Sequence, residues 1–191
     1  MEKETITNSV QEGSVSSNLS EITYVGIDNG VSGSIGIVRQ GHAVMLFMPT
    51  RSELSYTKNK RNITRIDWKR LRELFYTTLP RGTNEHGEGV VKVFLERPMV
   101  NPSRFQATSS ALRAMEATLI VIEAFNLPLQ YVDSKQWQKV MLPGGLKGSD
   151  VLKEASKDIG CRMFPNLSGA ITKHGDADGL LMAEWARRER L

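Results

Sequence analysis

The sequence has only one cysteine, Cys161. A lone thiol excludes a framework of intrachain disulfides and any zinc site built from several thiolates. The chain also has no apolar run of the ~18 residues that a membrane span requires, and its first residues lack the apolar core of a signal peptide. In a chain of 191 residues with 40% hydrophobic and 24% charged residues, these absences indicate a single cytoplasmic globular domain.

Hydrophobic periodicity is missing from the N-terminus. Residues 1–20 are polar and rich in Ser, Thr and Asn, so we expect a disordered arm there and an ordered domain over residues 21–191. Glutamates outnumber lysines in this arm, which argues against an organelle transit peptide.

Acidic residues are scarce between residues 51 and 72, although the whole chain carries a net charge of only +4. The basic residues of this stretch are Arg51, Lys58, Lys60, Arg61, Arg65, Lys69, Arg70 and Arg72, and its only acidic residues are Glu53 and Asp67. Such a concentration of positive charge suits a polyanionic partner such as a nucleic acid backbone. A solvated loop and helix face would produce the same pattern, and composition leaves both interpretations open.

The hydrophobic pattern predicts a mixed sheet flanked by helices. We expect three antiparallel strands followed by parallel strands that alternate with helices, which is an α/β arrangement. The expected strands cover residues 22–28, 34–39, 42–48, 90–96 and 128–133, and the expected helices cover 67–79, 107–125, 134–141, 149–159 and 176–190. Asp67 is the predicted N-cap of the first helix.

Two acidic residues stand where predicted strands end. Asp28 follows Tyr-Val-Gly-Ile and precedes a glycine-rich turn, and Glu96 closes the run Val-Val-Lys-Val-Phe-Leu. Aspartate is disfavoured in strands, and ligands collect at strand ends in α/β sheets, so the pair indicates a site. Each acid has a structural alternative: Asp28 could cap its own turn, and Glu96 could pair with Arg97.

A third acid, Asp178, lies at the start of the last predicted helix, within Lys-His-Gly-Asp-Ala-Asp-Gly. Helix capping and compensation of the helix dipole also place acids at such a position, and Asp176 is the better candidate for the cap. His174 stands four residues before Asp178, so the two share a face if helical geometry extends that far.

Carboxylates from Asp28, Glu96 and Asp178 would suit a pair of Mg²⁺ ions, since Mg²⁺ prefers oxygen ligands and keeps positions for water and phosphate oxygens. Two such ions ~3.5–4 Å apart activate a water and stabilise the leaving oxygen of a phosphodiester. We expect two Mg²⁺ per site, replaceable by Mn²⁺. Asp28 would bridge both ions, and Glu96 and Asp178 would each complete one.

These segments together resemble the RuvC-like Holliday-junction resolvases of the RNase H-like, or retroviral-integrase, superfamily. Residues 26–33 are similar to the first motif of the family, with Asn29 in place of a frequent proline, residues 93–96 to the second, and residues 177–183 to the third, with Gly179 in place of an alanine. The resemblance covers about residues 22–190.

The resemblance implies an RNase H-like fold and a homodimeric, metal-dependent endodeoxyribonuclease. Such an enzyme resolves four-way DNA junctions by paired symmetric nicks and leaves 5′-phosphate and 3′-hydroxyl ends. It also implies a fourth metal ligand three or four residues before the last aspartate, where this sequence has Gly175 and His174. Either His174 is that ligand or a proton handler, or a distorted helix start lets Asp176 replace it. We favour His174 and keep Asp176 as the alternative catalytic residue.

Most candidate DNA contacts follow Glu96 in the sequence. The full set of candidates is Arg61, Arg65, Arg104, Phe105, Gln106, Ser109, Arg113, Lys135 and Lys147. Phe105 is either a wedge against an unstacked base or, as we favour, a buried core residue. We expect Lys139, Lys153 and Lys157 to be solvent-face charges.

The predicted helix over residues 107–125 contains the apolar run Leu-Ile-Val-Ile at residues 119–122. A helix that is apolar all round is buried on several sides. This run therefore indicates either a dimer interface or a central core helix, and the sequence leaves both open.

Other functions fit part of the pattern. A related nuclease acting on RNA–DNA hybrids or other branched DNA would use the same acids. A non-catalytic junction-binding protein would need only the basic surface. An actin- or hexokinase-like ATPase would share the first glycine turn, but the chain lacks a convincing second phosphate loop and the length for a second domain, so no nucleotide cofactor is expected.

Overall fold

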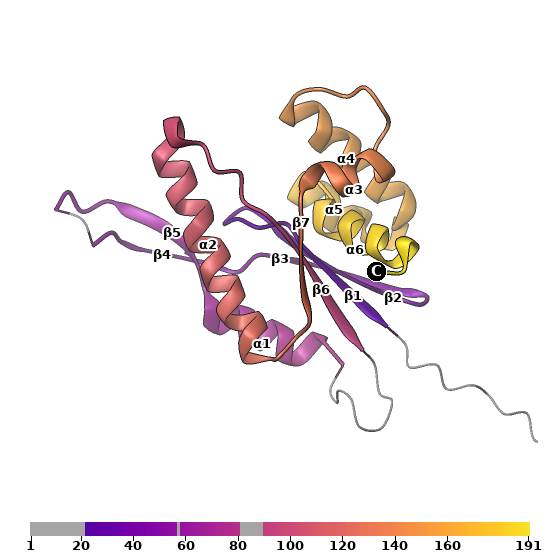
Figure 1. Cartoon of the computed structure of the whole chain (residues 1–191), viewed down its shortest axis with the longest axis horizontal. Helices are drawn as coiled ribbons and strands as arrows, with labels where there is room; N and C mark the ends of the chain where they lie inside the picture. Colours follow the sequence, from indigo (N-terminus) through magenta and orange to yellow (C-terminus); the bar gives the residue numbers. More distant parts are fainter. Residues whose placement is uncertain (1–21, 57, 81–89) are drawn as a thin grey trace, which may run out of the picture.

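The computed structural model describes residues 22–56, 58–80 and 90–191. The arm expected over residues 1–20 lies outside these ranges. Figure 1 shows a twisted sheet with helices on both of its faces. No helix within the described ranges is long and apolar enough to cross a membrane.

The main sheet has five strands in the order β3-β2-β1-β6-β7. Its strands are β1 (Thr23–Ile27), β2 (Ser34–Arg39), β3 (His42–Phe47), β6 (Val91–Glu96) and β7 (Leu129–Val132). The first three form an antiparallel meander, and β6 and β7 run parallel to β1. This is the RNase H-like arrangement, so the fold class predicted from the sequence is confirmed.

The helices form a separate layer on each face of the sheet (Figure 1). One layer contains α1 (Trp68–Thr78) and α2 (Phe105–Ala124), and the other contains α3 (Ser134–Met141), α4 (Ser149–Met163), α5 (Ser168–His174) and α6 (Asp178–Glu189). Short 3₁₀ turns at Pro102–Arg104 and Pro165–Leu167 precede α2 and α5. The predicted cap of α1 is confirmed, because the Asp67 carboxylate accepts from the Arg70 N–H at 3.3 Å.

Alternation of side chains along the strands divides the core between the two layers. Val25 and Ile27 of β1 pack in the core with α1 and α2, whereas Tyr24 of the same strand packs in the core with α6. Phe94 of β6 stacks on Tyr24 and meets Trp185 of α6 edge to face. Burial of each such side chain contributes about 1.5–3 kcal/mol, which holds both helical layers on the sheet.

Glycines allow α6 to lie very close to β1 and β2. A Cβ atom on Gly26 would stand 2.3 Å from the Gly179 carbonyl oxygen, and one on Gly36 would stand 2.4 Å from the Leu180 Cα atom. Gly179 itself has no room for a methyl group, since a Cβ there would stand 2.8 Å from the Ser34 carbonyl oxygen. Close packing therefore requires a glycine at position 179, and the contact places the start of α6 beside β1.

The second half of α2 is a core helix with one exposed apolar position. Val121 and Ile122 are buried in the core beneath the sheet, whereas the Ile120 side chain is 52% exposed. The run at residues 119–122 is thus not buried on every side within the chain. The burial of Val121 and Ile122 is explained by the packing of α2 on the sheet. The exposed side chains of Ile120 and Leu112 remain available to a partner.

Two strands, β4 (Thr50–Leu54) and β5 (Asn62–Ile66), form a separate antiparallel sheet that the sequence did not predict. Their sequences, Thr-Arg-Ser-Glu-Leu and Asn-Ile-Thr-Arg-Ile, are mostly polar on both faces. A strand without an apolar face gives no alternation signal. Before α1, much of the basic segment therefore forms a hairpin, where the sequence analysis had expected no strand.

Candidate active site

Asp28 and Glu96 lie side by side at one edge of the main sheet. The parallel pairing of β1 with β6 sets Ile27 opposite Leu95, so the next residue of each strand is an acid. Neither acid adopts the structural alternative considered from the sequence. Among the described residues, no hydrogen bond reaches the Asp28 carboxylate.

The Glu96 carboxylate pairs with an aromatic side chain and not with the neighbouring Arg97. Trp137 of α3, which is fully buried, donates its indole N–H to the Glu96 Oε2 at 3.4 Å. Arg97 instead contacts Asp133 at 3.3 Å. Glu96 is thus directed toward the interior of the site and carries no salt bridge from Arg97.

Asp178 is the first residue of α6, and Ala177 is the N-cap. The Asp176 carboxylate accepts from the Asp178 N–H at 3.4 Å, so it performs part of a cap's role from outside the helix. α5 ends at His174, and Gly175 follows with a left-handed φ of 102°. Helical geometry therefore does not extend from His174 to Asp178, so the condition for a shared helical face is not met.

Three carboxylates converge on one point. Ligand oxygens of Asp28, Asp176 and Asp178 all lie within 4.8 Å of one another. Asp176 is buried although it is an acid, and Asp28 and Asp178 are partly buried. The structure therefore brings Asp176 into the group, which the sequence had offered only as an alternative to His174.

Burial and mutual repulsion make these carboxylates hard to ionise. Burial, followed by repulsion from Asp176, raises the pKa of Asp28 to about 6. The same two causes raise the pKa of Asp178 to about 7. Burial and then repulsion from Asp28 and Asp178 raise the pKa of Glu96 to about 8. The surroundings of Asp28, Asp178 and Glu96 therefore disfavour the charged form of each carboxylate.

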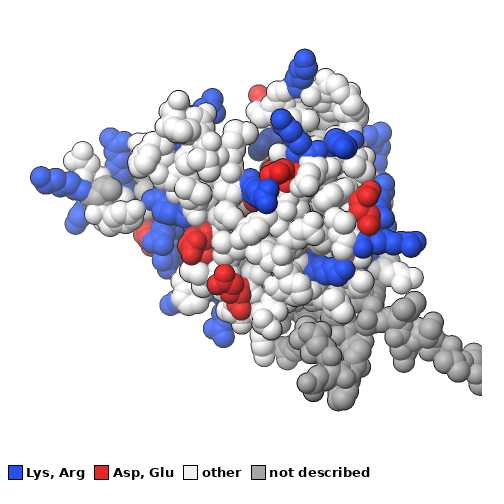
Figure 2. Space-filling view, viewed as in Figure 1, with Lys and Arg blue, Asp and Glu red and all other residues white. Residues whose placement is uncertain are grey.

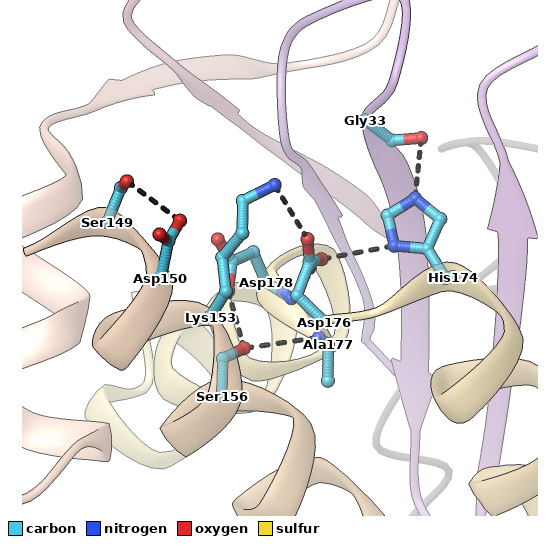
Figure 3. Close-up of polar contacts among 9 residues, drawn as sticks. All are labelled: Gly33, Ser149, Asp150, Lys153, Ser156, His174, Asp176, Ala177 and Asp178. Atoms are coloured by element: carbon cyan, nitrogen blue, oxygen red, sulfur yellow. Dashed lines mark hydrogen bonds and ion pairs between the residues drawn. The ribbon is translucent and has the colours of Figure 1, made fainter.

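His174 contacts Asp176 and the turn after β1 with its two ring nitrogens (Figure 3). Its Nδ1 lies 3.1 Å from the Asp176 Oδ1, and its Nε2 lies 3.2 Å from the Gly33 carbonyl oxygen. A carbonyl oxygen only accepts, so Nε2 is the donor, and a proton on Nδ1 as well gives an imidazolium that suits both contacts. The hydrogen bond to Asp176 raises the pKa of His174 in spite of burial. Burial opposes ionisation of Asp176, but His174 holds its pKa below the usual value.

Two residues of α4 that the sequence did not single out as site residues complete the cluster (Figure 3). The Ser156 hydroxyl, fully buried, donates a short hydrogen bond to Asp178 and accepts from the Ala177 N–H at 3.1 Å. The Lys153 Nζ lies 3.6 Å from the Asp176 Oδ2. The prediction that Lys153 is a solvent-face charge is wrong, because its 56% exposed side chain reaches into the cluster. The sequence of α4 did not indicate a site role for either residue, because their contacts with the acids arise only from the packing of α4 against α6.

The donor set fits a hard divalent cation. It offers several carboxylate oxygens at close range, and the ion pairs that Lys153 and His174 make within the cluster both go to Asp176. Asp28, Asp178 and Glu96 are left with raised pKa values that a nearby cation would lower again. Oxygen ligands of this kind are those that Mg²⁺ prefers.

The candidate DNA contacts come from several separate elements of the fold. Arg104, Phe105 and Gln106 are exposed at the start of α2, with Ser109 and Arg113 on the following turns of the same helix. The preference for a buried Phe105 is wrong, because its side chain is 77% exposed. Lys135 lies in α3, Lys147 lies in the loop just before α4, and Arg61 and Arg65 lie on the β4–β5 hairpin.

The start of α2 is linked to the acid cluster through the turn after β1. The Asn29 side-chain amide donates to the Ala111 carbonyl of α2 at 3.3 Å. Asn29 follows Asp28 directly. Its hydrogen bond couples the position of α2, and hence of Phe105, to the residue beside the site.

No model of a known protein family matches the chain, and no curated protein matches its sequence. Among solved structures, the chain is similar to T. thermophilus RuvC in complex with a Holliday junction substrate, with 14% identity and a TM-score of 0.48 over 89% of this chain and 96% of that chain. It is also similar to a Thermus thermophilus RuvC structure, with 12% identity and a TM-score of 0.43 over the same shares of both chains. Since both TM-scores are below 0.5, the fold assignment rests on the strand order and directions of this chain.

Proposed function

We propose that the protein is a metal-dependent, structure-selective endodeoxyribonuclease that resolves four-way DNA junctions. It would make paired symmetric nicks and leave 5′-phosphate and 3′-hydroxyl ends. The observation that carries the nuclease assignment is the convergence of Asp28, Asp176 and Asp178 beside Glu96 at one edge of an RNase H-like sheet. The junction as substrate rests on the resemblance of three sequence motifs to the RuvC-like resolvases.

The residues of the chain have distinct roles in this proposal. Asp28, Asp176, Asp178 and Glu96 would hold Mg²⁺, which when bound activates water and stabilises charge on the phosphate. Ser156 holds the Asp178 carboxylate in place, and His174 does the same for Asp176. Lys153 is exposed beside the cluster, and its ammonium group would bind a non-bridging oxygen of the scissile phosphate. The phosphate would compete with the Asp176 carboxylate for this ammonium group.

The exposed start of α2 would meet the junction itself. Phe105 is a large apolar side chain in water next to Arg104 and Gln106, which suits insertion beside an unstacked base while the polar neighbours bind phosphates. Two symmetric nicks require two active sites, and a homodimer supplies them. The exposed Leu112 and Ile120 on α2 are apolar positions available for that contact.

One gel tests the function against its rivals. A mobile four-way junction, an RNA–DNA hybrid duplex and a flap would each be incubated with and without Mg²⁺. We expect symmetric nicks in the junction, dependent on Mg²⁺, with little cleavage of the other two substrates. Preferential cleavage of the hybrid or the flap would instead support the related-nuclease alternative. Tight junction binding without any metal-dependent cleavage would support the non-catalytic alternative.

A pair of substitutions distinguishes the candidate fourth ligands. We place Asp176 as the ligand and His174 as the residue that positions it. Asp176→Asn should abolish the rise in melting temperature on addition of Mg²⁺. His174→Ala should keep that rise but shift it to higher Mg²⁺ concentration, about 10- to 100-fold, as is usual when a ligand's hydrogen-bond partner is lost. Near-wild-type Mg²⁺ titrations and cleavage rates for both variants would exclude both assignments.

A further inference from the structure

The β4–β5 hairpin projects from the body as a two-stranded arm. Figure 1 shows it extending away from the main sheet beside α2, and it forms no ladder with that sheet. Its base is buried at Met48 and Ile66, which belong to the core with α1 and α2. We call residues 50–66, apart from residue 57, the β4–β5 arm.

The base of the arm is attached to the same edge of the sheet as the acid cluster. β3 leads into the arm, and its last residue, Phe47, pairs with Ser34 at the start of β2. The Met48 N–H then donates to the Gly33 carbonyl at 3.0 Å, which is the oxygen that His174 also contacts. A ligand held in the acid cluster is therefore next to the point from which the arm emerges.

The two faces of the arm differ in charge. The face with Arg51, Glu53 and Arg65 is half-buried, and Glu53 pairs with both arginines, with Arg51 at 3.2 Å. This pairing offsets the repulsion of Arg51 and Arg65, which lie directly opposite each other in the ladder. The opposite face carries the small polar residues Thr50, Ser52, Asn62 and Thr64, with the exposed Leu54 near the tip and the buried Ile66 at the base.

The tip of the arm combines cations with an exposed aromatic ring. Lys58, Lys60 and Arg61 are all exposed, and the Tyr56 side chain is 82% exposed. Figure 2 shows Lys and Arg side chains gathered at this end of the molecule. The Ser55 N–H donates to the Arg61 carbonyl at 2.8 Å, which extends the pairing of the two strands to the base of the tip.

The arm has the dimensions and chemistry of an element that binds duplex DNA. The five residues of β4, Thr50–Leu54, span roughly 16 Å at about 3.3 Å per residue. A turn of B-DNA spans about 34 Å over roughly ten base pairs, so the arm matches about half a turn. A two-stranded ribbon fits against the grooves of B-DNA, and its hydroxyl and amide side chains can donate to phosphate oxygens.

We propose that the β4–β5 arm binds the backbone of a DNA duplex that leads away from the active site. The cations at the tip contact phosphates about five base pairs from the cleaved one, since the arm spans about half a turn of DNA, and Tyr56 packs on the sugars beside them. This inference rests on the proposed function for the placement of the cleaved phosphate. It adds a binding surface outside the acid cluster and outside the start of α2.

The test is a binding experiment that needs no cleavage. A four-way junction with long arms would be titrated in EDTA with wild type and with Lys60→Ala/Arg61→Ala. We expect Kd to rise about tenfold at moderate salt, and the slope of log K against log salt to fall by about 1.8, since each lost phosphate contact removes about 0.9. The matched control is Arg39→Ala/Arg162→Ala, which removes two exposed arginines from β2 and α4 and should leave both quantities unchanged.

A second pair of variants separates the ring from the charge. Tyr56→Ala should raise Kd about fivefold without changing the salt slope, because a ring contact releases no counterions. Tyr56→Phe keeps the ring and should bind as wild type. Circular dichroism and thermal melting of each variant show that the fold is retained before binding is compared.

Neutral methylphosphonate linkages locate the contact on the DNA. Placed about five to eight base pairs from the crossover, they should weaken wild type but cause no further loss in Lys60→Ala/Arg61→Ala. Placed about twelve or more base pairs away, they should affect neither protein. Unchanged affinity and salt slope in Lys60→Ala/Arg61→Ala would overturn the proposal. It would also be overturned if this variant lost self-association in analytical sedimentation, because the arm would then be a contact between protein chains. A chain that binds as expected but cleaves nothing with Mg²⁺ would refute the proposed function and leave the arm's role standing.

Discussion

Asp28→Asn should reduce Mg²⁺-dependent junction cleavage about 10³-fold or more while leaving junction affinity in EDTA unchanged. A bound metal supplies several kcal/mol of transition-state stabilisation, and each loss of about 1.4 kcal/mol costs a factor of ten in rate. Among the described residues, none donates a hydrogen bond to the Asp28 carboxylate, which leaves its oxygens open to a metal ion. Single-turnover cleavage and a gel-shift titration measure the two quantities.

The same substitution should stabilise the metal-free protein at neutral pH. Folding raises the pKa of Asp28 from 3.8 to about 6, so folding favours its protonated form. The charged form therefore costs stability, and this cost develops as the pH rises from about 4 through about 6. An asparagine has no such charge and should raise the free energy of unfolding by roughly 3 kcal/mol at pH 7.

Asp158→Asn is the matched control, because Asp158 is exposed on α4. It should change neither cleavage nor stability by a measurable amount. Urea denaturation in EDTA at pH 5 and pH 7 gives the stabilities. The assignment of Asp28 fails if Asp28→Asn cleaves at the wild-type rate. Loss of both binding and cleavage with a lower melting temperature would point instead to a folding defect.

Gly36→Ala should destabilise the protein by about 3 kcal/mol and lower cleavage together with stability. The new Cβ would stand 2.4 Å from the Leu180 N and Cα atoms, which are backbone atoms and cannot rotate away. α6 must then move off the sheet, and overpacking of a core costs about 1–3 kcal/mol. Asp178 starts that helix, so its carboxylate would move away from Asp28 and Asp176.

A substitution at an open glycine isolates this effect. Gly144 has no heavy atom within 4 Å of the position that an added Cβ would occupy, so Gly144→Ala should stay within about 0.5 kcal/mol of wild type. Urea denaturation measures the stability of both variants, and the cleavage rate is compared at a temperature where each is folded. Wild-type stability in Gly36→Ala would mean that α6 does not pack as closely as described.

Much of the fold could be predicted from local pattern. The strand at 34–39 and the helix at 134–141 have the predicted bounds, because both alternate or repeat their apolar residues with a clear period. Asp28 and Glu96 could be singled out because each acid follows a run of buried apolar residues, where a charged side chain does not stabilise the strand. Parallel pairing of the two strands then makes them neighbours.

Contacts between distant segments gave no such signal. Whether His174 or Asp176 belongs to the carboxylate group depends on the left-handed turn at Gly175, which directs Asp176 into the cluster and leaves His174 behind it. Lys153 and Ser156 reach the site only because α4 packs beside the start of α6. The β4–β5 arm could not be predicted because neither of its strands has an apolar face.

The sequence by itself determined which acids stand at strand ends, because hydrophobic periodicity and the burial of strands are properties of neighbouring residues. It also determined the mixed sheet and the positive charge of residues 51–72. Only the tertiary structure decided which carboxylates meet, which cation lies among them and where the basic segment points. Those contacts join residues far apart in the chain, and they depend on the close packing of α6 on Gly26 and Gly36, which no local pattern encodes.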